Sequence, residues 1–265
     1  MSKNYFHSLS SYLKYVSKSK TKFAIHSPFV FDYITKVLEV KEKNEALDQI
    51  HARYKELLNS SRVVETTDFG APKGRKIYSV RFSSVSQLAR KSSVPRRYGE
   101  MLYRTVEWFK PAAILEMGTC LGISSLYMAK AAPQAKFYTL EGCAAKSELA
   151  RTNFEKLGMD QIEISTGRFC DTLPVVLGKM PSPDFVFIDG HHQYKPTLSY
   201  FDQILKYANE GTVLVIDDIH WSGGMEKAWH EICQRADVSV TIDLYRMGLV
   251  FLRKGLSKQN FIIKY

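Results

Sequence analysis

Short apolar runs recur along the last two thirds of the chain, with helix-like stretches between them. Five of these runs lie near residues 112–117, 136–140, 161–165, 183–188 and 212–216. Continuous apolar runs of this length, bounded by turn residues, predict parallel strands buried on both faces. Two further runs, at 238–244 and 249–253, flank a short turn and predict an antiparallel hairpin. The pattern therefore predicts a doubly wound α/β domain.

The first 60 residues have the apolar spacing of helices, over 5–18, 28–40 and 45–59. Residues 61–95 show little periodicity and many serine and basic residues, so we expect a loop or lid there. Gly70 and Gly74 are interpreted as turn residues, because no strand and helix flank them as in a phosphate-binding loop. We expect a helical extension and lid in 1–95 and the α/β domain in 96–265, with its first helix at 97–109.

A turn between the first strand and the next helix contains Gly118 and Gly122, and Ser124 opens the helix. Such a turn brings a ligand to bare backbone and to the free N–H groups of a helix start. A dinucleotide fingerprint would need glycine at 116 and 121, where the chain has Glu116 and Leu121. Because a carboxylate repels a pyrophosphate, a cationic ligand is favoured.

The second strand ends in Glu141, an acid suited to holding the two hydroxyls of a ribose. Glu116, Gly118, Gly122 and Glu141 together resemble the first two motifs of the class I S-adenosylmethionine-dependent methyltransferases. The resemblance extends over about residues 94–253 and is closest to the O-methyltransferases of the catechol type and their bacterial relatives. It implies a seven-stranded, mostly parallel Rossmann-like sheet and methyl transfer from S-adenosylmethionine to an oxygen of a small molecule.

The same resemblance implies a set of cofactor-binding residues. Ser124 matches a serine that meets the cofactor carboxylate, and Arg168 and Phe169 belong to the motif beside the adenine. Helix capping or pairing with lysine is the alternative role for Glu116 and Glu141, and core packing is the alternative for Phe169. The full set is Val94, Glu116, Gly118, Thr119, Gly122, Ser124, Glu141, Gly142, Arg168, Phe169 and Asp189.

The fourth strand leads into Asp189, Gly190, His191 and His192, a pattern that resembles bacterial O-methyltransferase-like proteins. Aligned on Asp189, His192 falls where catechol-type enzymes place their catalytic lysine. Histidine serves as a general base near neutral pH, so the resemblance implies Asp189 and His192 as catalytic residues. The alternative is that the two adjacent histidines are exposed surface residues without a catalytic role.

The fifth strand ends in Asp217 and Asp218, which with Asp189 match the three metal ligands of the catechol-type family. Asp218 departs from that family, which usually has asparagine there. Three carboxylates suit Mg²⁺ or another divalent ion, while the alternative assigns two of these acids to the cofactor amine and the acceptor. His220 and Trp221 follow as candidates for the acceptor wall.

The amino-acid composition limits what the chain's class, cellular location and partners can be. The 265 residues are 45% hydrophobic and 24% charged, as in globular proteins, and four cysteines without C-x-x-C spacing predict reduced thiols. No apolar run is long enough to cross a bilayer and no signal-peptide core opens the chain, so we expect a cytoplasmic protein. The net charge of +10 and the N-terminal lysines leave RNA methylation as an alternative, beside a non-catalytic cofactor-binding protein. A small-molecule acceptor is favoured over nucleic acid, and a homo-oligomer is left open.

Overall fold

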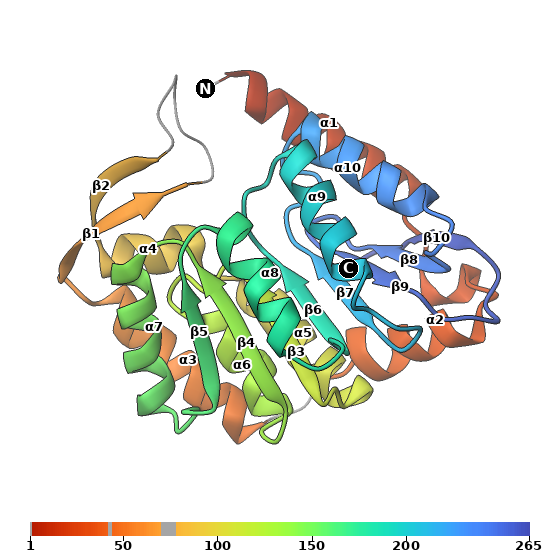
Figure 1. Ribbon diagram of the computed structural model, residues 1–265. Coiled ribbons are helices and arrows are strands. Elements are labelled where there is room, and N and C mark those ends of the chain that lie inside the picture. Colours follow the sequence, from red (N-terminus) through yellow and green to blue (C-terminus); the bar gives the residue numbers. More distant parts are fainter. Residues whose placement is uncertain (1, 42–43, 70–77) are drawn as a thin grey trace. The chain divides into compact units, whose positions relative to one another are not determined.

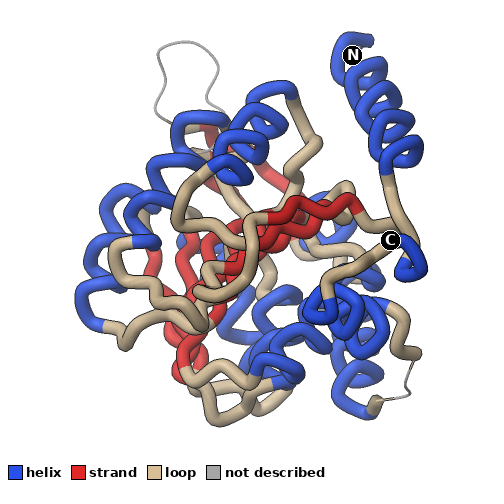
Figure 2. Tube along the Cα trace, turned by 90° about the vertical axis from the view of Figure 1, so that its right-hand side faces the viewer, coloured by secondary structure: helices blue, strands red, loops and turns tan. Residues whose placement is uncertain are grey.

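The computed structural model describes residues 2–41, 44–69 and 78–265 (Figure 1). The chain forms two compact units, here called the central unit (residues 39–181) and the terminal unit (residues 1–38 and 182–265). Both units contain helices and strands, which Figure 2 shows in blue and red. The division differs from the expected boundary at residue 95, because residues 1–38 group with residues 182–265 and residues 39–95 group with residues 96–181.

In the part of the central unit that the structure describes, three parallel strands lie in the order β3-β4-β5, with helices in the connections. Strand β3 is buried along its whole length, as its continuous apolar run predicts. The strands begin and end within two residues of the predicted runs. The unit's α/β elements are α5 (Arg96–Phe109), β3 (Ala113–Met117), α6 (Ile123–Ala131), β4 (Lys136–Glu141), α7 (Ala144–Lys156), β5 (Ile162–Thr166) and α8 (Phe169–Lys179), and α3 (Glu45–Leu58) precedes them.

Residues 61–95 are more regular than expected. Strands β1 (Val63–Asp68) and β2 (Ser79–Ser84) pair antiparallel, and α4 (Val85–Ser92) follows directly. A capping box begins α4, in which Ser84 accepts from the Gln87 N–H and the Gln87 side chain accepts from the Ser84 N–H. The loop prediction was therefore wrong for these elements, and Gly70 and Gly74 lie outside the described residues.

In the terminal unit the described residues form five strands in the order β10-β8-β9-β7-β6. Strands β6 and β7 are parallel, as are β8 and β10, whereas β9 is antiparallel to both β7 and β8. The predicted hairpin is β8 and β9, and β10 is a further strand, so the two units hold eight α/β strands rather than seven in the described residues. The unit's α/β elements are β6 (Phe185–Ile188), α9 (Tyr194–Leu205), β7 (Val213–Ile216), α10 (Gly223–Gln234), β8 (Val240–Asp243), β9 (Gly248–Phe251) and β10 (Gln259–Ile262).

The N-terminal helices of the terminal unit pack on these C-terminal strands. The Tyr15 hydroxyl donates to the Ile263 carbonyl, and Lys20 forms a β-bridge with Ile263. The Phe29 ring meets the Phe251 ring edge to face, with the centroids 4.9 Å apart. These contacts explain why residues 1–38 belong with residues 182–265. The helices are α1 (Ser2–Lys18), the short η1 (Lys22–Ala24), α2 (Pro28–Tyr33) and the π-helical η2 (Ile34–Leu38).

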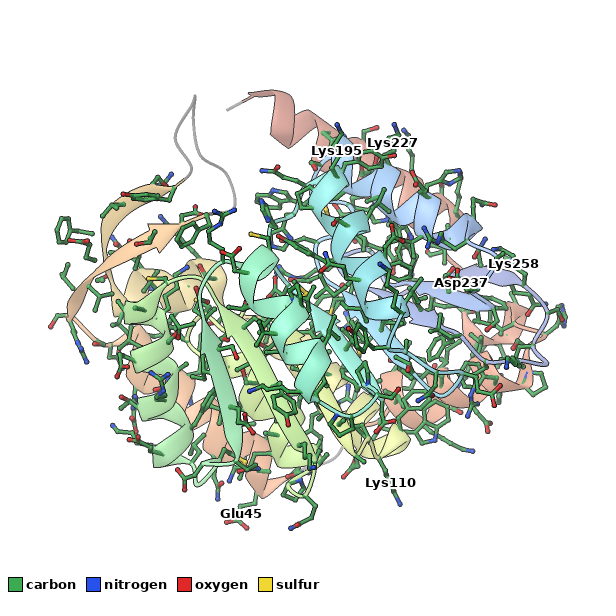
Figure 3. The ribbon with its side chains drawn as sticks, viewed as in Figure 1. Glu45, Lys110, Lys195, Lys227, Asp237 and Lys258 are labelled. Carbon is green, nitrogen blue, oxygen red and sulfur yellow. The ribbon has the colours of Figure 1, made fainter. Side chains whose placement is uncertain are left out.

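The positive charge is spread over several elements. In the terminal unit Lys195, Lys227 and Lys258 project outward from α9, α10 and the segment before β10, as does Lys110 in the central unit (Figure 3). Within the described residues no helix is both long and apolar enough to cross a membrane.

Candidate active site

The predicted glycine turn connects β3 to α6 in the central unit. Gly118 and Gly122 have φ angles of 109° and 74°, in the left-handed region that favours glycine. A Cβ at Gly122 would also lie 2.4 Å from the Phe154 ring. The Gly118 and Thr119 N–H groups donate to the Leu140 carbonyl over 2.9 and 3.2 Å, which fastens the turn to the end of β4. Among the described residues the N-cap of α6, Gly122, has no side-chain cap hydrogen bond, and the first N–H groups of a helix have no partner within the helix itself.

Glu116 lies beneath this turn and is fully buried. Ser124 and Thr139 donate to its carboxylate over 2.6 and 2.7 Å, and Ser125 donates to the same group. Burial raises the pKa of Glu116 to about 6; these hydroxyls oppose the rise and the charge of Glu141 adds to it. The structure thus gives Glu116 and Ser124 a shared role that the sequence did not predict, since they link the strands to α6.

Glu141 ends β4 and is held by backbone donors. The Cys120 N–H donates to Oε2 over 2.8 Å and the Cys143 N–H donates to Oε1 over 2.9 Å. Each carboxylate oxygen has a second lone pair available for a further donor, such as a ribose hydroxyl. The side chain is therefore fixed in orientation before a ligand arrives.

The hairpin of β1 and β2 reaches the residues next to Glu141. A Cβ built on Gly142 would lie 2.8 Å from Cδ2 of Phe69, the residue after β1, so the glycine permits this close approach. The Thr67 N–H also donates to the Cys143 sulfur over 3.3 Å. The hairpin thus covers the Glu141 end of β4 within the central unit.

The other predicted cofactor residues of the central unit differ in exposure. Val94 and Thr119 are buried, and the Thr119 hydroxyl lies 2.6 Å from that of Thr139. Arg168 is exposed at the N-terminus of α8, with its Nε 3.7 Å from the Asp171 carboxylate, and Phe169 is half-buried. Arg168 and Phe169 are thus more accessible than Val94 and Thr119.

The predicted acid–base residues lie in the terminal unit, after β6 and β7. Because Ile188 pairs with Ile216 in parallel register, Asp189 and Asp217 come next to each other at the same strand end. The His192 ring lies between two carboxylates, with Nε2 3.4 Å from Asp189 and Nδ1 3.9 Å from Asp218. The structure therefore brings Asp189, His192 and Asp218 together.

The sequence prediction missed Arg246, in the turn between β8 and β9. Its Nε and Nη2 donate to the two carboxylate oxygens of Asp217 over 3.0 and 2.8 Å, and Nη2 lies 3.5 Å from Asp218. The position of Arg246 follows from the pairing of β9 with β7. The two strands are antiparallel with Gly248 opposite Ile216, so residues just before Gly248 meet those just after Ile216. Among the described residues no group of three His, Cys, Asp or Glu side chains is arranged to hold a metal ion.

His220 and Trp221 do not share one environment. The His220 ring lies 3.0 Å from Glu226 and 2.8 Å from Asp243 through its two nitrogens. Burial alone would lower the pKa of His220, but these two acids outweigh it and raise the pKa. Trp221 is exposed. His220 is therefore held in a polar network, and only Trp221 remains accessible as a wall residue.

Residues 115–219, which include the glycine turn, Glu141, Asp189, His192 and Asp217 but not Arg246, match the sequence profile of a family described as a methyltransferase domain. This segment is therefore similar in sequence to a methyltransferase domain. The chain is 32% identical over 136 residues to a catechol O-methyltransferase of Mycobacterium tuberculosis, covering 50% of this chain and 60% of that protein. A catechol O-methyltransferase of Niastella koreensis is also 32% identical, over 48% of this chain and 58% of its own length. The chain thus spans about three fifths of these curated relatives.

Solved structures support the methyltransferase fold. An O-methyltransferase from Bacillus cereus in complex with SAH matches with a TM-score of 0.57 and 20% identity, over 84% of this chain and 97% of that chain. TomG, an O-methyltransferase of Streptomyces achromogenes in complex with SAM, matches with a TM-score of 0.56 and 22% identity, over 84% and 96%. The predicted α/β class is confirmed by these likenesses, with β10 as the additional strand.

Proposed function

We propose that this protein transfers the methyl group of S-adenosylmethionine to an oxygen of a small molecule. The observation that carries the proposal is the fastened glycine turn beside Glu141, in a methyltransferase domain whose curated relatives are named catechol O-methyltransferases. When bound, the cofactor supplies an electrophilic methyl group. The chain's own tasks are to bind the cofactor, align the acceptor and remove a proton.

The central unit would hold the cofactor. The N–H groups at the start of α6 suit its carboxylate, and Glu141 suits the ribose hydroxyls. Glu116 and Glu141 also place two acids around the turn, which favours a ligand with sulfonium and ammonium charges. Val94, Gly142, Arg168 and Phe169 remain proposed contacts from the family resemblance.

The terminal unit would handle the acceptor proton. His192 is the proposed base, because its ring lies between the carboxylates of Asp189 and Asp218, which hold it at the ends of β6 and β7. Catechol is the first acceptor to try, given the names of the relatives. A cytoplasmic location stays a prediction from the sequence.

Calorimetry with S-adenosylhomocysteine (SAH) tests the cofactor role. Replacing Glu141 by alanine should weaken SAH binding by about 1–3 kcal/mol, because ribose hydrogen bonds to a charged acceptor are lost. Glu148→Ala, an exposed carboxylate on α7 paired with Arg151, is the matched control and should bind normally. Unchanged affinity in Glu141→Ala would remove Glu141 from the site.

Transfer of labelled methyl separates the rival activities. The proposal expects label in a small-molecule acceptor and loss of about 10² in rate in His192→Ala. Label found in RNA would favour the nucleic-acid alternative, and SAH binding without any transfer from SAM would favour a binding protein.

A further inference from the structure

The turn between β8 and β9 presents a cation to the acids that the family resemblance assigns to a metal. Asp217 is fully buried and binds the Arg246 guanidinium through both carboxylate oxygens. Asp218 lies 3.5 Å from the same guanidinium. A two-bond, side-by-side contact of this kind is the strongest geometry between arginine and a carboxylate.

Several contacts fix the position of this turn. The Leu244 N–H donates to the Met247 carbonyl over 2.9 Å, and the Ile219 N–H donates to the Arg246 carbonyl over 3.1 Å. The second of these bonds joins the turn directly to the segment after β7. Tyr245 and Asp218 have φ angles of 70° and 54°, which is uncommon for residues other than glycine. Both sides of the contact are therefore held in defined backbone conformations.

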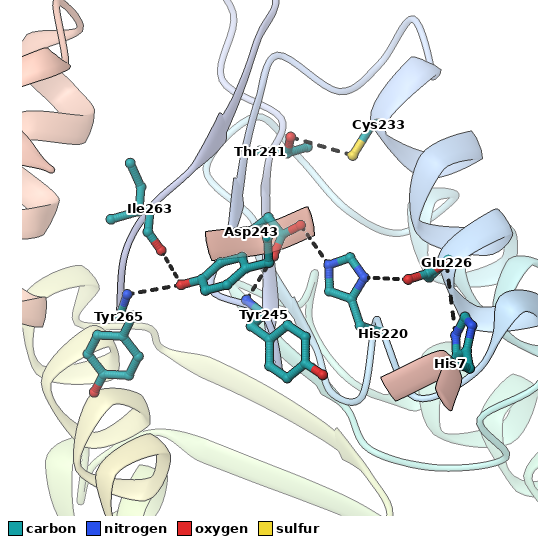
Figure 4. Close-up of polar contacts among 10 residues, drawn as sticks. His7, His220, Glu226, Cys233, Thr241, Asp243, Tyr245, Ile263 and Tyr265 are labelled. Carbon is teal, nitrogen blue, oxygen red and sulfur yellow. Dashed lines mark hydrogen bonds and ion pairs between the residues drawn. The ribbon is translucent and has the colours of Figure 1, made fainter. Parts of the chain in front are cut away.

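A polar network fixes the start of the same turn, at Asp243 and Tyr245 (Figure 4). Asp243 accepts from the Tyr245 N–H over 2.8 Å through Oδ1, and its Oδ2 lies 2.8 Å from the His220 ring. His220 comes two residues after Asp218, so the network ties the turn to the acids a second time. Arg246 is thus built into the acid cluster and does not reach it as a loose surface side chain.

A divalent ion does not fit this arrangement. Mg²⁺ needs carboxylate oxygens at about 2.0–2.1 Å, and it would be repelled by the guanidinium that already lies against both oxygens of Asp217. Aspartate at 218 adds a negative charge where the resembled family has a neutral asparagine. That extra charge suits a fixed arginine nearby.

We infer that Arg246 takes the place of a divalent cation in this protein, neutralising Asp217 and orienting Asp218 toward His192. Arg246 is then a positioning residue, which acts through the two aspartates. The importance of this role for catalysis rests on the proposed function. Whether Arg246 takes the place of a metal ion can be tested without cofactor or acceptor.

Titration with Mn²⁺, followed by electron paramagnetic resonance, tests the replacement on the full chain. The wild-type protein should show no saturable site with Kd below about 1 mM. Arg246→Met removes the guanidinium while keeping an apolar stem, so the freed carboxylates should bind Mn²⁺ at least about tenfold more tightly than wild type. Arg235→Met is the matched control, because Arg235 also pairs with two aspartates, Asp202 and Asp237, and should gain no site.

Thermal unfolding gives a second readout. The melting temperature of Arg246→Met should fall by about 6 °C or more, since two acids lose their counter-charge, and Mn²⁺ should restore part of the loss. EDTA and Mg²⁺ should leave the wild-type melting temperature unchanged.

Two results would overturn the inference. One is a wild-type site with Kd below about 1 mM for Mn²⁺ that disappears in Asp217→Asn, because Asp217 would then bind metal in spite of Arg246. The other is a folded Arg246→Met that binds Mn²⁺ no better than wild type, because the pair would then be structural only. If Arg246→Met does not fold, the wild-type and Asp217→Asn titrations still decide the first point. SAH binding is measured separately, so failure here leaves the cofactor proposal standing.

Discussion

Glu116 in the central unit and Asp217 in the terminal unit are both fully buried carboxylates near the ends of parallel strands. Glu116 is stabilised by neutral donors, the hydroxyls of Ser124, Ser125 and Thr139. Asp217 is stabilised by a full positive charge on Arg246. Hydroxyls leave a net negative charge in the protein when the acid is ionised, whereas a guanidinium cancels it.

This difference matches the two tasks proposed for the units. A cationic cofactor gains from the negative charge of Glu116, which its hydroxyl donors do not cancel, whereas the charge of Lys146 offsets part of that of Glu141. In the terminal unit Asp217 and Asp218 must stay close to each other and to His192 without strong repulsion between their negative charges. The comparison thus predicts that the two carboxylates respond in different ways to mutation and to pH.

The largest effect is expected where a charge pair is broken. Asp217→Asn leaves the Arg246 charge without its main partner, so the free energy of unfolding should fall by about 3–5 kcal/mol. The double variant Asp217→Asn/Arg246→Met should lose much less than the sum of the two single losses, because both singles break one interaction. Urea unfolding measures all four proteins. Additive losses would mean that the two residues act separately.

A smaller, pH-dependent effect is expected at Glu116. With its pKa raised to about 6 from an ordinary 4.5, native Glu116 keeps its proton where the unfolded chain has lost it. Stability from this group is therefore lost as pH rises from 4.5 to 6, by about 2 kcal/mol in total. Glu116→Gln has no such titration, so its stability relative to wild type should increase by that amount over the same range.

Urea unfolding of both proteins from pH 4 to pH 7 checks this prediction. Glu148→Gln serves as the control, because Glu148 is exposed and pairs only at the surface with Arg151. A difference between Glu116→Gln and wild type that stays constant over the range would show that Glu116 is not the responsible group.

Patterns along the chain were sufficient for most of the α/β fold. The apolar runs located β3 to β9 to within two residues at each end, because buried strands need continuous apolar sequence. The apolar runs did not predict β1, β2 and β10. Most residues of these strands are exposed or partly exposed, so the strands do not need a continuous apolar sequence. The capping box of Ser84 and Gln87 was a usable signal for α4 that periodicity alone did not reveal.

The candidate site was predictable where its residues follow strands directly. Asp189 and Asp217 were placed side by side because parallel strands end at one edge. Arg246 was missed because it comes from a turn whose place depends on how β9 pairs, and a turn sequence does not reveal its neighbours. Glu116 was placed near the turn correctly, but its three hydroxyl donors come from two further elements and required the folded structure.

The smallest effect concerns how the hairpin of β1 and β2 lies against the end of β4. Gly142→Ala would place a Cβ 2.8 Å from the Phe69 ring, which has to shift, so the local contact should weaken by about 1 kcal/mol. Local opening would then be about fivefold more frequent, and limited proteolysis should cut between residues 61 and 95 faster by that factor. In a Phe69→Ala background the ring is absent, so Gly142→Ala should add no further increase. An equal increase in both backgrounds would show that Gly142 does not hold the hairpin through Phe69.

If SAH slows cutting in the wild type and slows it less in Gly142→Ala, the hairpin also serves as the lid that the sequence predicted, because closure over Glu141 would then depend on the cofactor.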